Sequence, residues 1–224
     1  MREYHNTRLP HDSRRETLWK TLCESYFQRF VSPPDTVLEL GCGYGDFINH
    51  IQCATKIAAD RWPGIAEYLN PGVRAEVGDI TLLTGIAAHS VDFVFASNVF
   101  EHLTQPEMAA CLNQVRRVLR PGGTINIVQP NYRLCYAEYF DDYTHVSIYS
   151  DRSLSDFLRA NGFDILHCQP RFLPLTIKSR LPVWPALIKA YLASPVKPLA
   201  KQMFIRAGLE QGAEEGAQEG HAAR

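Results

Sequence analysis

Three glycines, Gly41, Gly43 and Gly45, alternate with other residues directly after a short apolar run at 36–40. Glycine adopts backbone angles that other residues avoid and has no Cβ, so the chain can turn sharply there and lie close to a bound nucleoside. By themselves the glycines indicate only a tight turn after a strand. The spacing is G-x-G-x-G, because position 46 is Asp46, where a dinucleotide fingerprint requires glycine. This spacing and the short chain argue against an NAD-dependent oxidoreductase.

Aspartates follow the next two segments that are predicted to be strands. Asp60 ends the run at 56–60, and Asp79 stands in the sequence Gly78-Asp79-Ile80 just after the run at 73–77. A carboxylate can accept hydrogen bonds from both hydroxyl groups of a ribose. Either aspartate alone is more typical of an ordinary loop or cap. Both aspartates stand at strand ends, on the edge of the sheet where the glycine turn also lies.

Two histidines are candidates for a catalytic base, because an imidazole changes charge near neutral pH. His102 follows the apolar run at 91–97, and His145 closes the sequence Asp141-Asp-Tyr-Thr-His145. The second group also resembles a set of metal ligands. Three ligands within five residues of one loop are weak grounds for a divalent cation. We therefore predict no metal site.

Short apolar strands alternate with amphipathic helices along most of the chain. The patterns predict strands at 36–40, 56–60, 73–77, 91–97, 124–129, 163–168 and 201–207, and helices at 14–30, 46–52, 63–69, 106–119 and 153–161. This order favours the α/β class: a Rossmann-like, seven-stranded, mostly parallel sheet with helices on both faces and an antiparallel last strand.

Length and composition limit the organisation of the chain and its partners. The 224 residues, 46% of them hydrophobic, suffice for one sizeable core. We expect a helical segment at 1–34, one domain at 35–207 and a disordered tail at 208–224. The net charge of −1 shows no basic footprint for nucleic acid. Six cysteines without a C-x-x-C pair, and no apolar leader, favour a cytoplasmic protein.

Residues 35–169 resemble the class I, Rossmann-like S-adenosylmethionine-dependent methyltransferases, in particular those of types 11 and 23. The motifs occur in the family's order: the glycine turn, the two acids, VDFVFASNVFEHL at 91–103 and LRPGGTI at 119–125. The resemblance implies S-adenosylmethionine as cofactor. Asp60 would then bind the ribose, Asp79 and Ile80 the adenine, and Asn98 would lie on the methionine side. The cofactor-binding candidates are Glu39, Gly41, Cys42, Gly43, Gly45, Asp60, Arg61, Asp79, Ile80 and Asn98.

The same resemblance directs the search for the acceptor. Family members that methylate planar nitrogens carry Asn-Pro-Pro-aromatic, whereas this chain has Ser97-Asn-Val-Phe100. A small-molecule or glycan hydroxyl is therefore favoured, with His145 as base and His102 as competitor. The alternatives are a methyltransferase for another small molecule or macromolecule, and a non-catalytic S-adenosylmethionine-binding regulatory subunit.

An apolar and basic segment at 170–200 is predicted to be an insertion. Large apolar residues stand there beside Arg171, Lys178, Arg180 and Lys189. Such a composition suits peripheral contact of residues 171–199 with the inner face of a membrane. A lid over the site or a dimer contact explains it equally well, and the oligomeric state stays open. This stretch and residues 131–162 are also similar to methyltransferases among bacterial surface-polysaccharide enzymes.

Overall fold

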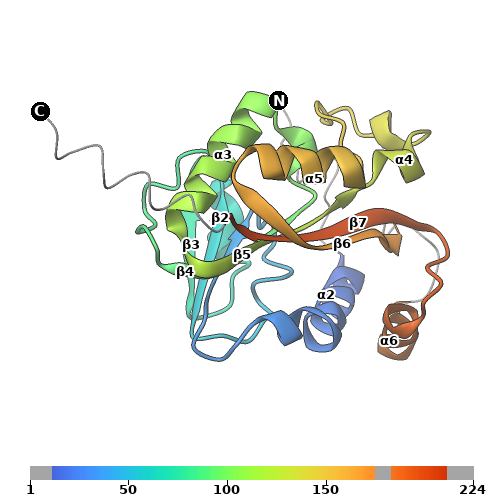
Figure 1. The fold of residues 1–224 in the computed structure, drawn as a ribbon. Coiled ribbons are helices and arrows are strands. Elements are labelled where there is room, and N and C mark those ends of the chain that lie inside the picture. The colour runs from blue at the N-terminus through green and yellow to red at the C-terminus, as the bar shows by residue number, and fades with distance from the viewer. Residues whose placement is uncertain (1–11, 175–182, 211–224) are drawn as a thin grey trace, which may run out of the picture.

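The structure is a computed structural model that describes residues 12–174 and 183–210, and its centre is a seven-stranded sheet (Figure 1). The strand order is β3-β2-β1-β4-β5-β7-β6. Strands β1 to β5 pair in parallel, and β7 is antiparallel to both β5 and β6. The strands are β1 (Thr36–Leu40), β2 (Thr55–Asp60), β3 (Val73–Val77), β4 (Val91–Ser97), β5 (Leu119–Pro130), β6 (Phe163–Pro174) and β7 (Ala200–Leu209). The predicted fold class is confirmed.

Helices cover both faces of the sheet. Figure 1 shows α3 (Gln105–Val118) and α5 (Asp151–Ala160) on one face, and α2 (Ser13–Ser25) and α6 (Pro185–Ala193) on the other. The remaining helical segments are short: α4 (Tyr132–Cys135), η1 (Phe27–Phe30), η2 (Pro63–Glu67), η3 (Phe100–His102) and η4 (Tyr139–Asp141). The layers are therefore those of a sheet with its two faces buried.

Alternation along the strands divides the core into two clusters. On β1, Leu38 and Leu40 join the cluster under α3 and α5, whereas Val37 faces the other side. There it meets Phe93 and Phe95 of β4, in a cluster rich in aromatic side chains under α2. Successive side chains of a strand point to opposite faces, so the apolar residues of a strand that is covered on both faces contribute to two cores.

Several predicted helices need correction. The helix expected at 14–30 is broken: α2 ends at Ser25, and η1 follows after Tyr26. The segment expected as a helix at 46–52 is a series of turns, with the amides of Asn49 and Ile51 bonded to the carbonyls of Gly45 and Phe47. The one at 63–69 shortens to the 3-10 turn η2. The helical periodicity of a sequence does not specify how long the helix is. Stretches as short as 46–52 and 63–69 depend on tertiary packing for their conformation.

The C-terminal part also differs from the predicted boundaries. Strand β6 runs on to Pro174, so the segment expected as an insertion at 170–200 begins inside the sheet. Strand β7 includes Gly208 and Leu209, which were expected in the tail. Most of the predicted tail, and residues 175–182, lie outside the described residues. Within residues 12–174 and 183–210, no helix has the length and apolar character needed to cross a bilayer.

Candidate functional site

The glycine turn lies where β1 meets β4 in the sheet order, which is the point where the chain changes direction across the sheet. Ligands of open α/β sheets bind at such points, outside the carboxyl ends of the strands. Gly41, Gly43 and Gly45 have φ angles of 61°, 52° and 71°, in the left-handed region. A Cβ on Gly41 would lie 2.6 Å from Cγ2 of Val99, which follows β4. Only glycine fits this turn without strain and displacement.

Asp60 ties the glycine turn to the end of β2. Its Oδ2 accepts a hydrogen bond from the amide of Gly43 at 2.9 Å, and its Oδ1 accepts one from the amide of Trp62 at 2.9 Å. Each carboxylate oxygen has a second lone pair, so Asp60 can accept further hydrogen bonds from a ligand. Arg61 is exposed next to it, whereas Cys42 is buried and burial raises the pKa of its thiol. The two sequence-predicted features are therefore one structural unit.

Glu39 lies beneath the turn, not in it. The side chain is 4% exposed, and its Oε2 accepts a hydrogen bond of 2.9 Å from the amide of Ile48. Burial raises the pKa of Glu39 well above its usual range, because removal from water penalises the charged carboxylate. Its described contact is to the protein, so it positions the segment that follows the glycines.

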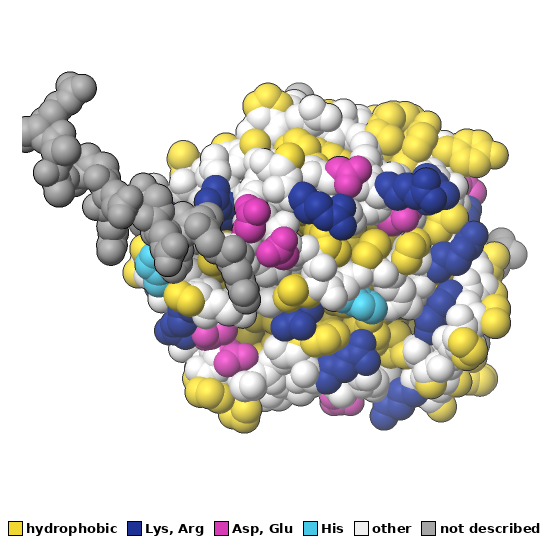
Figure 2. All heavy atoms as spheres, in the orientation of Figure 1, with side chains coloured by type: hydrophobic (Ala, Val, Ile, Leu, Met, Phe, Trp, Pro, Cys, Tyr) yellow, Lys and Arg dark blue, Asp and Glu magenta, His cyan; other side chains and the backbone are white. Residues whose placement is uncertain are grey.

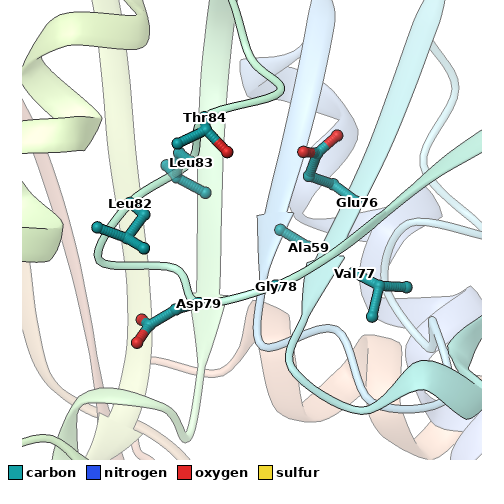
Figure 3. Close-up of a pocket in the computed structure, with 8 residues that line it drawn as sticks. All are labelled: Ala59, Glu76, Val77, Gly78, Asp79, Leu82, Leu83 and Thr84. Carbon is teal, nitrogen blue, oxygen red and sulfur yellow. The ribbon is translucent and has the colours of Figure 1, made fainter.

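A pocket of about 140 Å³ lies at the ends of β2 and β3 (Figure 3). Its lining includes Ala59 and Asp79, and Figure 3 shows the Asp79 carboxylate pointing away from Glu76. Asp79 is exposed, and hydrogen bonds from Thr81 lower its pKa, so it is a carboxylate at neutral pH. The next residue, Ile80, is buried with the core cluster under α3 and α5.

Asn98 follows β4 in a left-handed conformation, with φ of 54°. Its amide donates to the carbonyl of Val128, and its Oδ1 accepts a hydrogen bond of 2.8 Å from Nε2 of Gln202. Gln202 on β7 was not singled out in the sequence, because a lone glutamine in a strand carries no signal. This hydrogen bond connects the residue that follows β4 with a residue of β7.

The two candidate bases, His102 and His145, lie together, with ring centroids 5.0 Å apart. The amides of Val146 and Ser147 donate to the backbone carbonyl of Glu101, which holds the loop of His145 against η3. Glu101 itself is fully buried, and burial raises its pKa to about 8. Sequence reasoning missed Glu101, because a glutamate beside a histidine gives no sign of its burial.

Comparisons with known proteins agree with this geometry. Residues 38–127 match the family model described as "Methyltransferase domain". Over 141 residues, 58% of the chain, the sequence is 30% identical to an uncharacterized 37.1 kDa protein of transposon Tn4556 from Streptomyces fradiae. The match spans 39% of that relative's length.

Solved structures share the fold across nearly the whole chain. A SAM-dependent methyltransferase from Archaeoglobus fulgidus superimposes with a TM-score of 0.64 at 20% identity, over 91% of this chain and 96% of that one. A methyltransferase from Haloferax volcanii, in complex with the Trm112 methyltransferase activator, gives 0.66 at 18% identity, over 89% and 95%.

Proposed function

Because residues 38–127 match a methyltransferase family model and the fold is that of SAM-dependent methyltransferases, we propose that this chain is a class I S-adenosylmethionine-dependent methyltransferase that transfers the methyl group to a hydroxyl of a small molecule or glycan. S-adenosylmethionine is the cofactor of the family. Its sulfonium supplies an activated methyl group, so the protein has to bind it, exclude water and hold an oxygen in line with the methyl.

The cofactor site consists of the glycine turn and the strand ends beside it. Asp60 holds the ribose hydroxyls with its remaining lone pairs, beside the glycine turn to which it is hydrogen-bonded. Asp79 and Ile80 bind the adenine beside the pocket of Figure 3. Asn98, with the neighbouring Gln202, lies on the methionine side. Glu39 acts by supporting the turn.

The observation that carries the proposal is the pairing of His102 with His145. Nδ1 of His145 lies 2.6 Å from the carbonyl oxygen of Tyr139. A carbonyl oxygen only accepts, so Nδ1 of the neutral ring is protonated and the lone pair is on Nε2. A hydroxyl placed at Nε2 can give up its proton there as its oxygen attacks the methyl. We assign this role to His145, with His102 as its neighbour.

Exposed aromatic side chains around His145 support a glycan or similar polar acceptor. Tyr136, Phe140 and Tyr143 are 68%, 56% and 70% exposed. Figure 2 shows hydrophobic side chains gathered at the upper right, over α4. Aromatic rings combine an apolar face with polar edges, and this suits the mixed surface of a sugar.

The test is methyl transfer from labelled S-adenosylmethionine to a panel of sugars, nucleotide sugars and small alcohols. We expect His145→Ala to lower kcat by about 10²- to 10⁴-fold, the usual contribution of a general base. Its affinity for S-adenosylhomocysteine should stay within about threefold, and an exposed-histidine control, His167→Ala, should keep full activity. Tight cofactor binding with no turnover on any acceptor would instead favour the regulatory-subunit alternative.

Contact with an anionic membrane is the second part of the proposal. Residues 165–209 contain seven Lys or Arg and no Asp or Glu. Helix α6 has no buried residue, and Trp184 and Leu187 at its start are 66% and 46% exposed. In Figure 2, Lys and Arg side chains follow the right-hand edge of the molecule, where Figure 1 places α6. Apolar and basic side chains together favour the headgroup region. A lipid-linked glycan is the acceptor that fits both observations.

A further inference from the structure

Glu101, His102 and His145 form a group that the function proposed above uses only in part. Each offers one ligand atom, and these atoms lie within 4.8 Å of one another. The three residues come from η3 and from the loop after η4, so only the folded chain brings them together. The sequence suggested a different set, Asp141, Asp142 and His145, and no metal was predicted from it.

The carboxylate of Glu101 is the first sign of a ligand. Its side chain is fully buried, and neither Oε1 nor Oε2 has a hydrogen-bond partner within residues 12–174 and 183–210. A buried carboxylate without a partner is costly, unless it takes up a proton or binds a cation. No lysine or arginine ion pair to Glu101 occurs in the described part of the chain.

The orientation of both imidazoles is the second sign. Nδ1 of His102 lies 3.1 Å from the carbonyl oxygen of Thr144, and Nδ1 of His145 lies 2.6 Å from that of Tyr139. A carbonyl oxygen only accepts, so the neutral rings donate at Nδ1 and each Nε2 carries the lone pair. The hydroxyl of Thr144, also 3.0 Å from Nδ1 of His102, donates to Oδ1 of Asp142. Histidines that bind metals through one nitrogen donate the other N–H to a carbonyl or carboxylate in the same way.

We propose that Glu101, His102 and His145 bind a divalent cation of the Zn²⁺ class. Two imidazoles and one carboxylate are a ligand set of such cations, and three protein ligands leave a coordination position open. A site of this kind is not part of the function argued above.

The catalytic consequence rests on the proposed hydroxyl acceptor. Bound at the open position, the hydroxyl would have a lowered pKa and lose its proton to water, so the cation would replace His145 as the activating group. The resulting oxygen anion would form the new bond to the methyl carbon as the sulfur–carbon bond breaks, leaving neutral S-adenosylhomocysteine. Without the cation, His145 remains the base.

The experiment is a titration of full-length, tag-free protein, freed of metal by chelator, with Zn²⁺ by calorimetry and with Co²⁺ by visible absorption. No cofactor or acceptor is added. We expect one cation per chain with a micromolar or tighter Kd, and a Co²⁺ spectrum typical of low coordination number. Glu101→Gln, His102→Ala and His145→Ala should each weaken binding at least about tenfold. His167→Ala, an exposed histidine on β6, should bind as the wild type does.

Circular dichroism would show that each variant is folded, and Glu101→Gln keeps the size of the buried side chain. Absence of stoichiometric binding by the wild type would overturn the proposal, and so would binding that Glu101→Gln and His145→Ala leave unchanged. Because the readout contains no methyl transfer, the cation site can fail while His145 remains a base, and it can stand if no hydroxyl acceptor is found.

Discussion

The amide of Gly43 donates a 2.9 Å hydrogen bond to Oδ2 of Asp60, and this bond joins the glycine turn after β1 to the end of β2. The turn and the acid are adjacent, because parallel pairing aligns Leu40 with Ala59 just before them. At the proposed cofactor site, a change at Asp60 is therefore expected to act both on the ligand and on the glycine turn.

Replacing Asp60 by Ala should raise the Kd for S-adenosylhomocysteine by about 10- to 100-fold, since hydrogen bonds to a charged group contribute about 1.5–3 kcal/mol. The Kd of Asp60→Asn should lie between the values for the wild type and for Asp60→Ala, because one side-chain oxygen can still accept from the amide of Gly43. Calorimetric titration measures both values. Asp164→Ala, at an exposed position on β6, is the control. An unchanged Kd for Asp60→Ala would remove this residue from the cofactor site.

Gly41→Ala should destabilise the protein and abolish tight cofactor binding. Its positive φ costs a residue with Cβ about 1–3 kcal/mol, and the added carbon would meet Val99 at 2.6 Å. Gly122→Ala is the matched control, with φ of 80° and no atom within 4 Å of the added carbon. Chemical denaturation should show the smaller loss for the control, with cofactor binding intact. Equal losses in the two variants would argue against a crowded turn at Gly41.

The buried Glu39 makes stability depend on pH. Its folded-state pKa is raised well above the ordinary 4.5, so the folded protein holds the proton more tightly than the unfolded chain does. This contribution is fully present below about pH 4.5 and is lost as the pH rises toward the folded-state value. Relative to Glu39→Gln, which keeps an acceptor for Ile48, the wild type should lose up to about 1.4 kcal/mol per pH unit across that window.

Urea unfolding of wild type and Glu39→Gln at a series of pH values from 4 to about 8 measures this difference directly. The comparison cancels the titration of groups that the two proteins share. A free-energy difference between the two that stays constant with pH would mean that Glu39 ionises in the folded protein as it does in the unfolded chain.

The exposed start of α6 should govern membrane binding. Trp184→Ser combined with Leu187→Ser should reduce co-sedimentation with vesicles containing anionic lipid by about tenfold, because both apolar side chains leave the headgroup region. Raising the salt concentration should weaken binding of the wild type, and neutral vesicles should bind it less. Leu82→Ser, at an exposed residue between β3 and β4, is the control. Binding that is indifferent to the double substitution would favour a lid or a dimer contact at α6.

Much of the fold follows from local patterns along the chain. The strands β1, β3 and β4 have the predicted bounds. For β1 and β4 the reason is that a strand covered on both faces is largely apolar. The segment at 46–52 shows the limit of this reasoning. Its apolar residues fit a helix, yet in the structure they fill the space under Trp19 and Phe95 as a series of turns.

The sequence by itself indicated the methyltransferase resemblance, the sheet and the residues of the glycine turn, since these depend on residues close together in the chain. Tertiary structure alone decided that His102 and His145 lie side by side and that Gln202 reaches Asn98. It also decided that the side chain of Glu101 is buried with no hydrogen-bond partner among the described residues. Such contacts join segments far apart in sequence. Their geometry depends on the path that the loops take over the sheet, and this path cannot be predicted from the spacing or the types of the residues.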